Sequence, residues 1–135
     1  ALTLAQAFEQ SGVAAIFANE IEQLLAGKSA IIALVVIFFI TLVLTEVITN
    51  SAAAALVFPV AYNIAIGLGV SPLPLIMAVA FGASGSFISP YGYQTNIMVF
   101  NAGNYKIADF IKFGWPITLT YGLVVLILIP QIFPF

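Results

Sequence analysis

The stretch TEVITNSAAAALVFP, Thr45 to Pro59, places polar side chains in the middle of a strongly apolar sequence. The residues before it, AIIALVVIFFITLVL, carry no charge. A short polar cluster then follows, and it contains Thr45, Glu46, Thr49, Asn50 and Ser51. Four alanines come next and the apolar pattern resumes. The stretch therefore indicates two apolar helices with a polar interruption between them.

The composition indicates an all-α polytopic membrane protein. The chain is 63% hydrophobic and 6% charged, whereas a soluble domain carries about 25% charged residues. The mean hydropathy is +1.19. The net charge of −2 is too small to support nucleic-acid binding, and the absence of cysteine excludes disulfides. The absence of histidine argues against a transition-metal site.

The pattern divides the chain into five expected parts. Residues 1–28 are expected to form connecting helices, which suit either the membrane interface or packing outside the membrane. The other parts are a helical hairpin at 29–70 with its polar tip at 49–51, a broken transmembrane helix at 71–103 with its break at 89–96, a polar loop at 104–115, and a last transmembrane helix at 116–135. We expect the chain to be a piece of a longer transporter or channel, or one chain of an assembly.

The two interruptions predict a cavity within the membrane. Backbone polar groups in a bilayer must be paired, so unwound segments occur there only where protein or water covers them. Discontinuous helices of this kind line the binding sites of secondary transporters. The alternative is a pair of ordinary surface loops, because residues 30–48 span about 28 Å as a helix. A stripe of small residues favours close packing of the interrupted segments: Ala78, Gly82, Ser86 and Pro90.

Helix ends at the two breaks predict an ion-coupled anion site. Helices ending at a break offer free carbonyl groups that suit a cation, and helices starting there offer N–H groups that suit an anion. No Arg, Lys or His lies in the apolar segments, so a co-bound cation is the expected source of compensating charge. The candidate neutral side chains are Asn50, Ser51, Thr95 and Asn96. Glu46, as an ionisable residue in an apolar segment, is either a proton or cation carrier or a structural hydrogen-bond acceptor.

Two segments, TEVITNSAAAALVFPVA and SFISPYGYQTNIMVFNAGNYKIADFIKFGWP, resemble the second half of the divalent anion/sodium symporters. The triplet Thr49-Asn50-Ser51 matches that family's Ser-Asn-Thr motif with the hydroxyl residues exchanged. The resemblance implies half of an inverted-repeat transporter with a re-entrant hairpin. It also implies substrate contacts by residues 49–51 with Thr95 and Asn96, and a sodium ion held, partly by backbone oxygens, by Thr45, Ile48, Asn50, Pro90 and Gly92.

The resemblance further implies a partner repeat, and we expect a homodimer in the cell (inner) membrane. The sequence Tyr93-Gln94-Thr95 stands where dicarboxylate carriers usually have Thr-Pro-Pro. The segment GYQTN resembles instead the branch of sulfate or inorganic-anion permeases, which implies sulfate rather than dicarboxylate. The leading expectation is a sodium-coupled symporter that imports a divalent anion and is not an enzyme. The alternatives are a proton-coupled antiporter or oxyanion efflux protein, with Glu46 as its proton site, and a membrane scaffold without transport.

Overall fold

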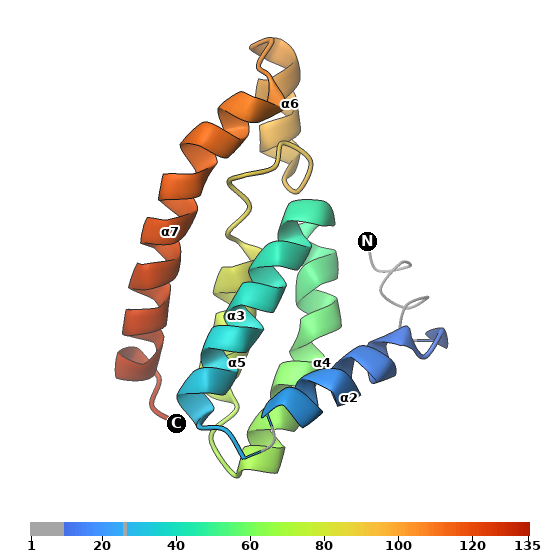
Figure 1. The fold of residues 1–135 in the computed structure, drawn as a ribbon, viewed down its shortest axis with the longest axis vertical. Coiled ribbons are helices and arrows are strands. Elements are labelled where there is room, and N and C mark those ends of the chain that lie inside the picture. Colours follow the sequence, from blue (N-terminus) through green and yellow to red (C-terminus); the bar gives the residue numbers. More distant parts are fainter. Residues whose placement is uncertain (1–9, 26) are drawn as a thin grey trace.

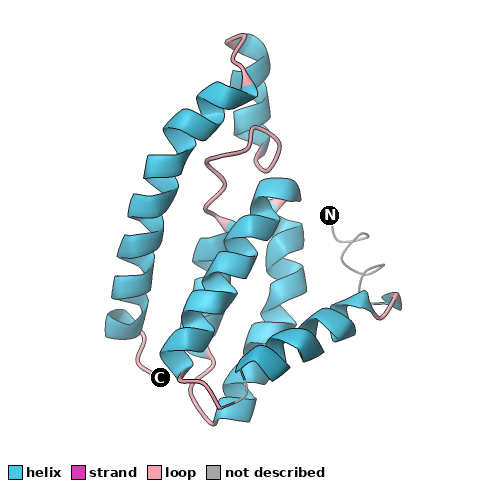
Figure 2. Ribbon diagram, in the orientation of Figure 1, coloured by secondary structure: helices cyan, strands magenta, loops and turns pink. Residues whose placement is uncertain are grey.

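The computed structural model describes residues 10–25 and 27–135, and the described residues are helical without any β-strand (Figures 1 and 2). The first part of the expected connecting helices, residues 1–9, lies outside this range. The helices are α2 (Val13–Leu25), α3 (Ala30–Val47), α4 (Asn50–Leu68), α5 (Leu73–Ala83), α6 (Gln94–Ala102) and α7 (Ile107–Ile132). Within the described ranges, α3, α4 and α7 are long and apolar enough to cross a membrane.

Helices α3 and α4 form the expected hairpin, and hydroxyl side chains start both of them. Ser29 Oγ accepts a hydrogen bond from Ile32 N at 3.4 Å, and Thr49 Oγ1 accepts one from Ala52 N at 3.3 Å. A hydroxyl at this position pairs an N–H that the helix itself leaves free. Only residues 48 and 49 separate the two helices. The polar cluster is therefore a tight helix-to-helix turn.

Helix α5 packs against both helices of the hairpin, and its small residues allow a close approach. A Cβ atom added at Gly82 would lie 2.9 Å from Phe38 O and from Thr41 Cβ. The whole predicted small-residue stripe is buried, although only Ala78 and Gly82 lie on a helix. The core between the three helices holds Leu34, Ile37, Phe38, Val57, Ala61, Ile64, Leu75 and Val79.

The break in the second apolar segment lies earlier than the expected 89–96. Helix α5 ends at Ala83, and α6 begins at Gln94, so the break comprises residues 84–93. The end of α5 tightens because Ser84 N and Gly85 N donate to carbonyls three residues back, at 3.1 and 3.2 Å. Ser84 Oγ also donates to Ala80 O at 2.9 Å. The early stop arises because serine and glycine favour local alternatives to the helix.

The expected polar loop 104–115 is wrong for most of its length, because α7 already begins at Ile107. Asp109 Oδ2 accepts the Lys106 N–H at 2.8 Å, which caps the first turn. Asp109 and Lys112 therefore lie in the first two turns of a helix, Lys106 is its N-cap residue, and the loop contracts to residues 103–106. Pro116 lies inside the helix, in its third turn.

The tip of the α3–α4 hairpin lies beside the break, while α6 and the start of α7 extend beyond it (Figure 1). At 1.5 Å per residue, α3 is about 27 Å long and α7 about 39 Å. The hairpin therefore ends well short of the α6–α7 connection. This arrangement places the two polar interruptions at the same height in the molecule.

Candidate functional site

The two interruptions meet through the hydroxyl group of Thr45, which is fully buried. Thr45 Oγ1 donates to the carbonyl oxygen of Ala83 at 2.8 Å. Thr45 lies in the last turn of α3, and Ala83 is the last residue of α5. A side chain from the hairpin thus satisfies a carbonyl that the end of α5 leaves without a helical partner.

The side-chain amide of Asn50 points at three oxygen atoms. Its inner end lies 2.7 Å from Thr45 Oγ1, 3.1 Å from Ala83 O and 3.2 Å from Gly92 O. With Nδ2 at this end, the amide is a hydrogen-bond donor to acceptors from both interruptions. With Oδ1 there, four oxygens converge and the Thr45 hydroxyl, bonded at 2.7 Å, is the one donor among them. The second orientation is the one that suits a bound cation.

Gly92 lets the break approach the hairpin closely enough to complete this cluster. A Cβ atom at this position would overlap Thr45 O and Ser86 Oγ. Gly92 is also buried, although neighbouring Tyr91 and Tyr93 are exposed. Glycine is required here because its backbone lies against the backbone of the hairpin tip.

Glu46 binds the backbone of the break, which is the structural alternative considered for it. Its Oε1 accepts hydrogen bonds from Phe87 N at 2.9 Å and Ile88 N at 3.0 Å. Its Oε2 accepts from Ser89 N at 2.6 Å and from Ser86 Oγ at 3.3 Å. One carboxylate from α3 thus pairs three consecutive amides of an unwound segment.

Asn96 pairs carbonyl groups of the same segment. Its Nδ2 donates to Ser86 O at 3.0 Å and to Ser89 O at 3.2 Å. Glu46 therefore satisfies amides of the break, and Asn96 satisfies carbonyls. Such pairing is what non-helical backbone needs at membrane depth.

A pocket of about 440 Å³ opens beside the hairpin tip. Residues of both interruptions line it: Thr49, Asn50, Ser51, Tyr91, Gly92, Tyr93, Gln94 and Ile97. The lining contains hydroxyl and amide groups and no Lys, Arg, Asp or Glu. Helices α4 and α6 both begin here, so their N-terminal amides face the same region. The pocket can therefore offer neutral donors to an anion but no full positive charge.

The structure brings together most of the sequence-predicted residues. Thr45, Asn50 and Gly92 contact one another, and Ser51 lines the pocket. Thr49 lines it as well, although its hydroxyl caps α4. The predicted sodium ligands Ile48 and Pro90 lie beside this cluster in the chain, in the hairpin turn and the break. Their carbonyl contributions stay predictions.

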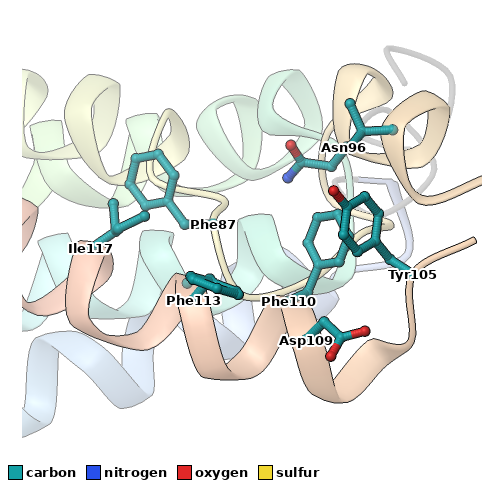
Figure 3. A pocket seen from close by; sticks show the side chains of 9 residues that line it. Phe87, Asn96, Tyr105, Asp109, Phe110, Phe113 and Ile117 are labelled. Carbon is teal, nitrogen blue, oxygen red and sulfur yellow. The ribbon is translucent and has the colours of Figure 1, made fainter. Parts of the chain in front are cut away.

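Thr95 and Asn96 are placed differently from Asn50. Both are in the first turn of α6, because the break ends before them, and neither lines the pocket at the hairpin tip. Asn96 instead lines a second pocket of about 390 Å³ between α6, α7 and Phe87. Figure 3 shows this pocket with the aromatic rings of Tyr105, Phe110 and Phe113 around it. Its lining is mainly apolar and includes the carboxylate of Asp109, so it suits apolar contact rather than an anion.

The sequence reasoning missed two kinds of group. One is the carbonyl oxygen of Ala83, which a sequence does not reveal because each residue carries the same group. The other is the pair of pocket-lining side chains Tyr91 and Ile97, whereas the sequence singles out Tyr93 and Gln94 only for substrate preference and not as lining of a pocket. A signal for these existed: they flank Gly92 in a segment that Pro90 already marks as irregular.

Comparison with known proteins agrees with the class that this fold and site define, a helical membrane transporter. The model of the citrate transporter family matches residues 1–134. An uncharacterized transporter of Synechocystis sp. is 37% identical over 98% of the chain and 22% of the relative. Sodium/sulfate cotransporter 1 of Chlamydomonas reinhardtii is 40% identical over 85% of the chain and 14% of the relative.

The sodium-dependent dicarboxylate transporter SdcS of Staphylococcus saprophyticus is 29% identical over 95% of the chain and 24% of that protein. The chain belongs to the citrate transporter family, and the resemblance to the divalent anion/sodium symporters is confirmed. The family and the three long apolar helices of the described residues make the chain a multi-pass membrane protein. The chain spans only about a seventh to a quarter of the length of these relatives.

Proposed function

We propose that this chain forms one half of the binding site of a sodium-coupled symporter that imports a divalent anion, with sulfate preferred over dicarboxylates. The observation that carries the proposal is the cluster of oxygens around Asn50. It joins both interruptions and lies next to a pocket lined by neutral donors.

The oxygen cluster is the proposed sodium site. Thr45 Oγ1, Ala83 O and Gly92 O surround the inner end of the Asn50 amide, whose Oδ1 would be the fourth ligand. Transporters of this architecture use unwound carbonyls and C-terminal helix ends to coordinate sodium. The cation would supply positive charge next to the pocket, which has no basic side chain in its lining.

The amide of Asn50 offers a physical reason for coupling. When its Oδ1 faces the cation, its Nδ2 is directed away from the oxygen cluster, and Asn50 also lines the pocket. An amide in this orientation would donate to an anion, as would the Ser51 hydroxyl and the Gln94 amide. Cation and anion would therefore favour the same orientation of one side chain.

The substrate preference rests on the segment GYQTN and on the relatives. Tyr93 and Gln94 line the pocket, at the positions where dicarboxylate carriers usually have the Thr and the first Pro of Thr-Pro-Pro. The Chlamydomonas relative is named as a sodium/sulfate cotransporter and is more similar to this chain than the named dicarboxylate transporter. A small pocket with hydroxyl and amide donors suits a compact tetrahedral oxyanion.

The complete transporter would add the partner repeat, whose own hydroxyl-Asn-hydroxyl motif would close the site from the opposite side. We further propose a homodimer in the cell (inner) membrane. A proton-coupled antiporter is the second candidate. The hydrogen bonds that occupy the Glu46 carboxylate speak against it, because a proton carrier would have to break them in each cycle.

Uptake of radiolabelled sulfate and succinate by the full-length protein in liposomes tests the proposal. We expect an inward sodium gradient to drive sulfate accumulation, with succinate a weaker substrate. A proton gradient without sodium should drive neither. Proton-driven uptake without sodium would favour the proton-coupled antiporter over the sodium symporter. Stronger accumulation of succinate than of sulfate would reverse the substrate assignment.

A further inference from the structure

We infer that Glu46 is a positioning residue of the cation site, because its carboxylate fixes the backbone that runs between the carbonyls of Ala83 and Gly92. The inference rests on the sodium-coupled function proposed above. It assigns to Glu46 a role in cation affinity that neither a proton carrier nor a general packing residue would have.

The Glu46 carboxylate contacts the middle of the break. Residues 84–91 connect the two carbonyl groups of the oxygen cluster. In the middle of this connection, the amides of residues 87, 88 and 89 converge on the two carboxylate oxygens, at 2.6 to 3.0 Å. Successive N–H groups that converge on one anion form a fixed concavity in the backbone. The path of the connection is therefore set by its fit to Glu46.

Ser86 connects Glu46 with Gly92. Ser86 Oγ donates to Glu46 Oε2 at 3.3 Å. Ser86 Oγ, together with Thr45 O, also fills the space where a side chain at residue 92 would begin. Ser86 therefore contacts Glu46 and the backbone of Gly92 at once, and its hydrogen bond links the two. The Gly92 carbonyl is one of the oxygens that face Asn50.

Glu46 lies at the end of α3, beside a residue of the oxygen cluster. It follows Thr45, whose hydroxyl belongs to the oxygen cluster, and it lies in the last turn before the hairpin tip. Its hydrogen bonds therefore hold the break in register with the tip. The ligands from the two interruptions keep their spacing only while this connection is intact.

The Glu46 carboxylate acts as a hydrogen-bond acceptor in each of these contacts. All four partners of Glu46 are hydrogen-bond donors. An ionised carboxylate only accepts, so it matches this set, whereas a carboxamide would turn an NH₂ group toward donors. The amides of residues 87–89 are also engaged within the protein and are not free to bind the transported anion.

The variant Glu46→Gln tests the inference in the full-length protein in liposomes, with sodium and radiolabelled sulfate. Charge-assisted hydrogen bonds are about twice as strong as neutral ones, so we expect the half-saturating sodium concentration to rise about tenfold. The KM for sulfate at saturating sodium should stay at the parent value. Glu20→Gln, the same change at an exposed residue of α2, is the matched control and should leave both values unchanged.

A second variant keeps the inference testable if Glu46→Gln is not recovered folded. Ser86→Ala removes one hydrogen bond to Glu46 and leaves the three amide bonds in place. We expect a smaller rise in the half-saturating sodium concentration. An unchanged value in a folded Glu46→Gln protein, or in Ser86→Ala when Glu46→Gln fails to fold, overturns the positioning role. If sulfate uptake by the parent protein does not depend on sodium, the proposed sodium-coupled function is refuted instead.

Discussion

The backbone of Gly114 in α7 lies directly against the carbonyl group of Phe87 in the break. A Cβ atom at residue 114 would overlap Phe87 O and come within 2.8 Å of Ile88 Cα. Helix α7 therefore packs against the same residues of the break whose amides Glu46 binds. The segment that carries the Gly92 carbonyl is thus held by both the hairpin and α7.

This contact predicts that Gly114→Ala destabilises the protein. The added methyl group meets backbone atoms, which move only together with the break, so we expect a loss of about 1–3 kcal/mol. Thermal unfolding in detergent measures it as a lower midpoint. Gly67→Ala is the control, because nothing lies within 4 Å of its added Cβ and alanine favours the helix. Equal midpoints for the two variants would contradict the close packing.

The hydroxyl group of Thr45 predicts a specific loss of sodium affinity. Thr45→Val keeps the side-chain volume but removes Oγ1, which belongs to the oxygen cluster and bonds Ala83 O. We expect the half-saturating sodium concentration to rise about tenfold, the equivalent of about 1.4 kcal/mol. Sodium titration of sulfate uptake in liposomes measures the change.

Thr41→Val is a closely matched control for Thr45→Val. Thr41 is also fully buried and lies one turn earlier in the same helix. Its hydroxyl donates to Ile37 O at 2.7 Å, within α3 itself, and reaches no part of the break. The control should keep the sodium dependence of the parent protein. A rise of equal size in both variants would assign the effect to the helix rather than to the cation site.

The amide of Asn50 predicts a coupled loss of both affinities. Asn50→Ala removes the group that faces the oxygen cluster and also lines the pocket, while the backbone carbonyls stay in place. We expect weaker binding of sodium and of sulfate, with folding retained. Asn63→Ala, an exposed position on the same helix, should change neither. A folded Asn50→Ala protein with both affinities intact would remove Asn50 from the site.

The hairpin could be predicted from the sequence because its signal is local. A polar cluster between two apolar runs implies a turn, and Thr49 at the start of α4 is a common helix cap. The limits of the break were harder to predict. Pro90 and Gly92 mark irregular backbone, but α5 already ends at Ala83, through tightened bonds and through amide pairing by Glu46. That pairing spans 41 positions of the chain and leaves no local pattern.

The assignment of polar side chains near the site could be predicted only in part. Asn50 and Asn96 both follow an interruption, and the sequence offers no way to tell them apart. The structure separates them by direction: Asn50 faces the oxygen cluster, and Asn96 faces carbonyls of its own segment. Direction depends on how the break folds back, which is a property of the tertiary structure.

The orientation in the membrane gives the last prediction. The loops at Lys28 and at residues 69–72 lie at one end of the molecule, and the connection at residues 103–106 lies at the other (Figure 1). Lys106 and Lys112 lie at or near the second end, against Lys28 at the first, and cytoplasmic segments carry an excess of lysine and arginine. We therefore expect residues 103–106 on the cytoplasmic side.

Single cysteines at Lys106 and Lys28, in a background without other accessible cysteines, test this orientation. Both side chains are exposed, whereas neighbouring Asn104 has a positive φ of 52° and is less suited to substitution. An impermeant thiol reagent should label Lys106→Cys in inverted vesicles and Lys28→Cys in intact cells. The reverse pattern would invert the topology. If both cysteines were labelled from the same side, the two ends would not lie on opposite sides of the membrane. In that case α7 and the α5–α6 pair would not cross it.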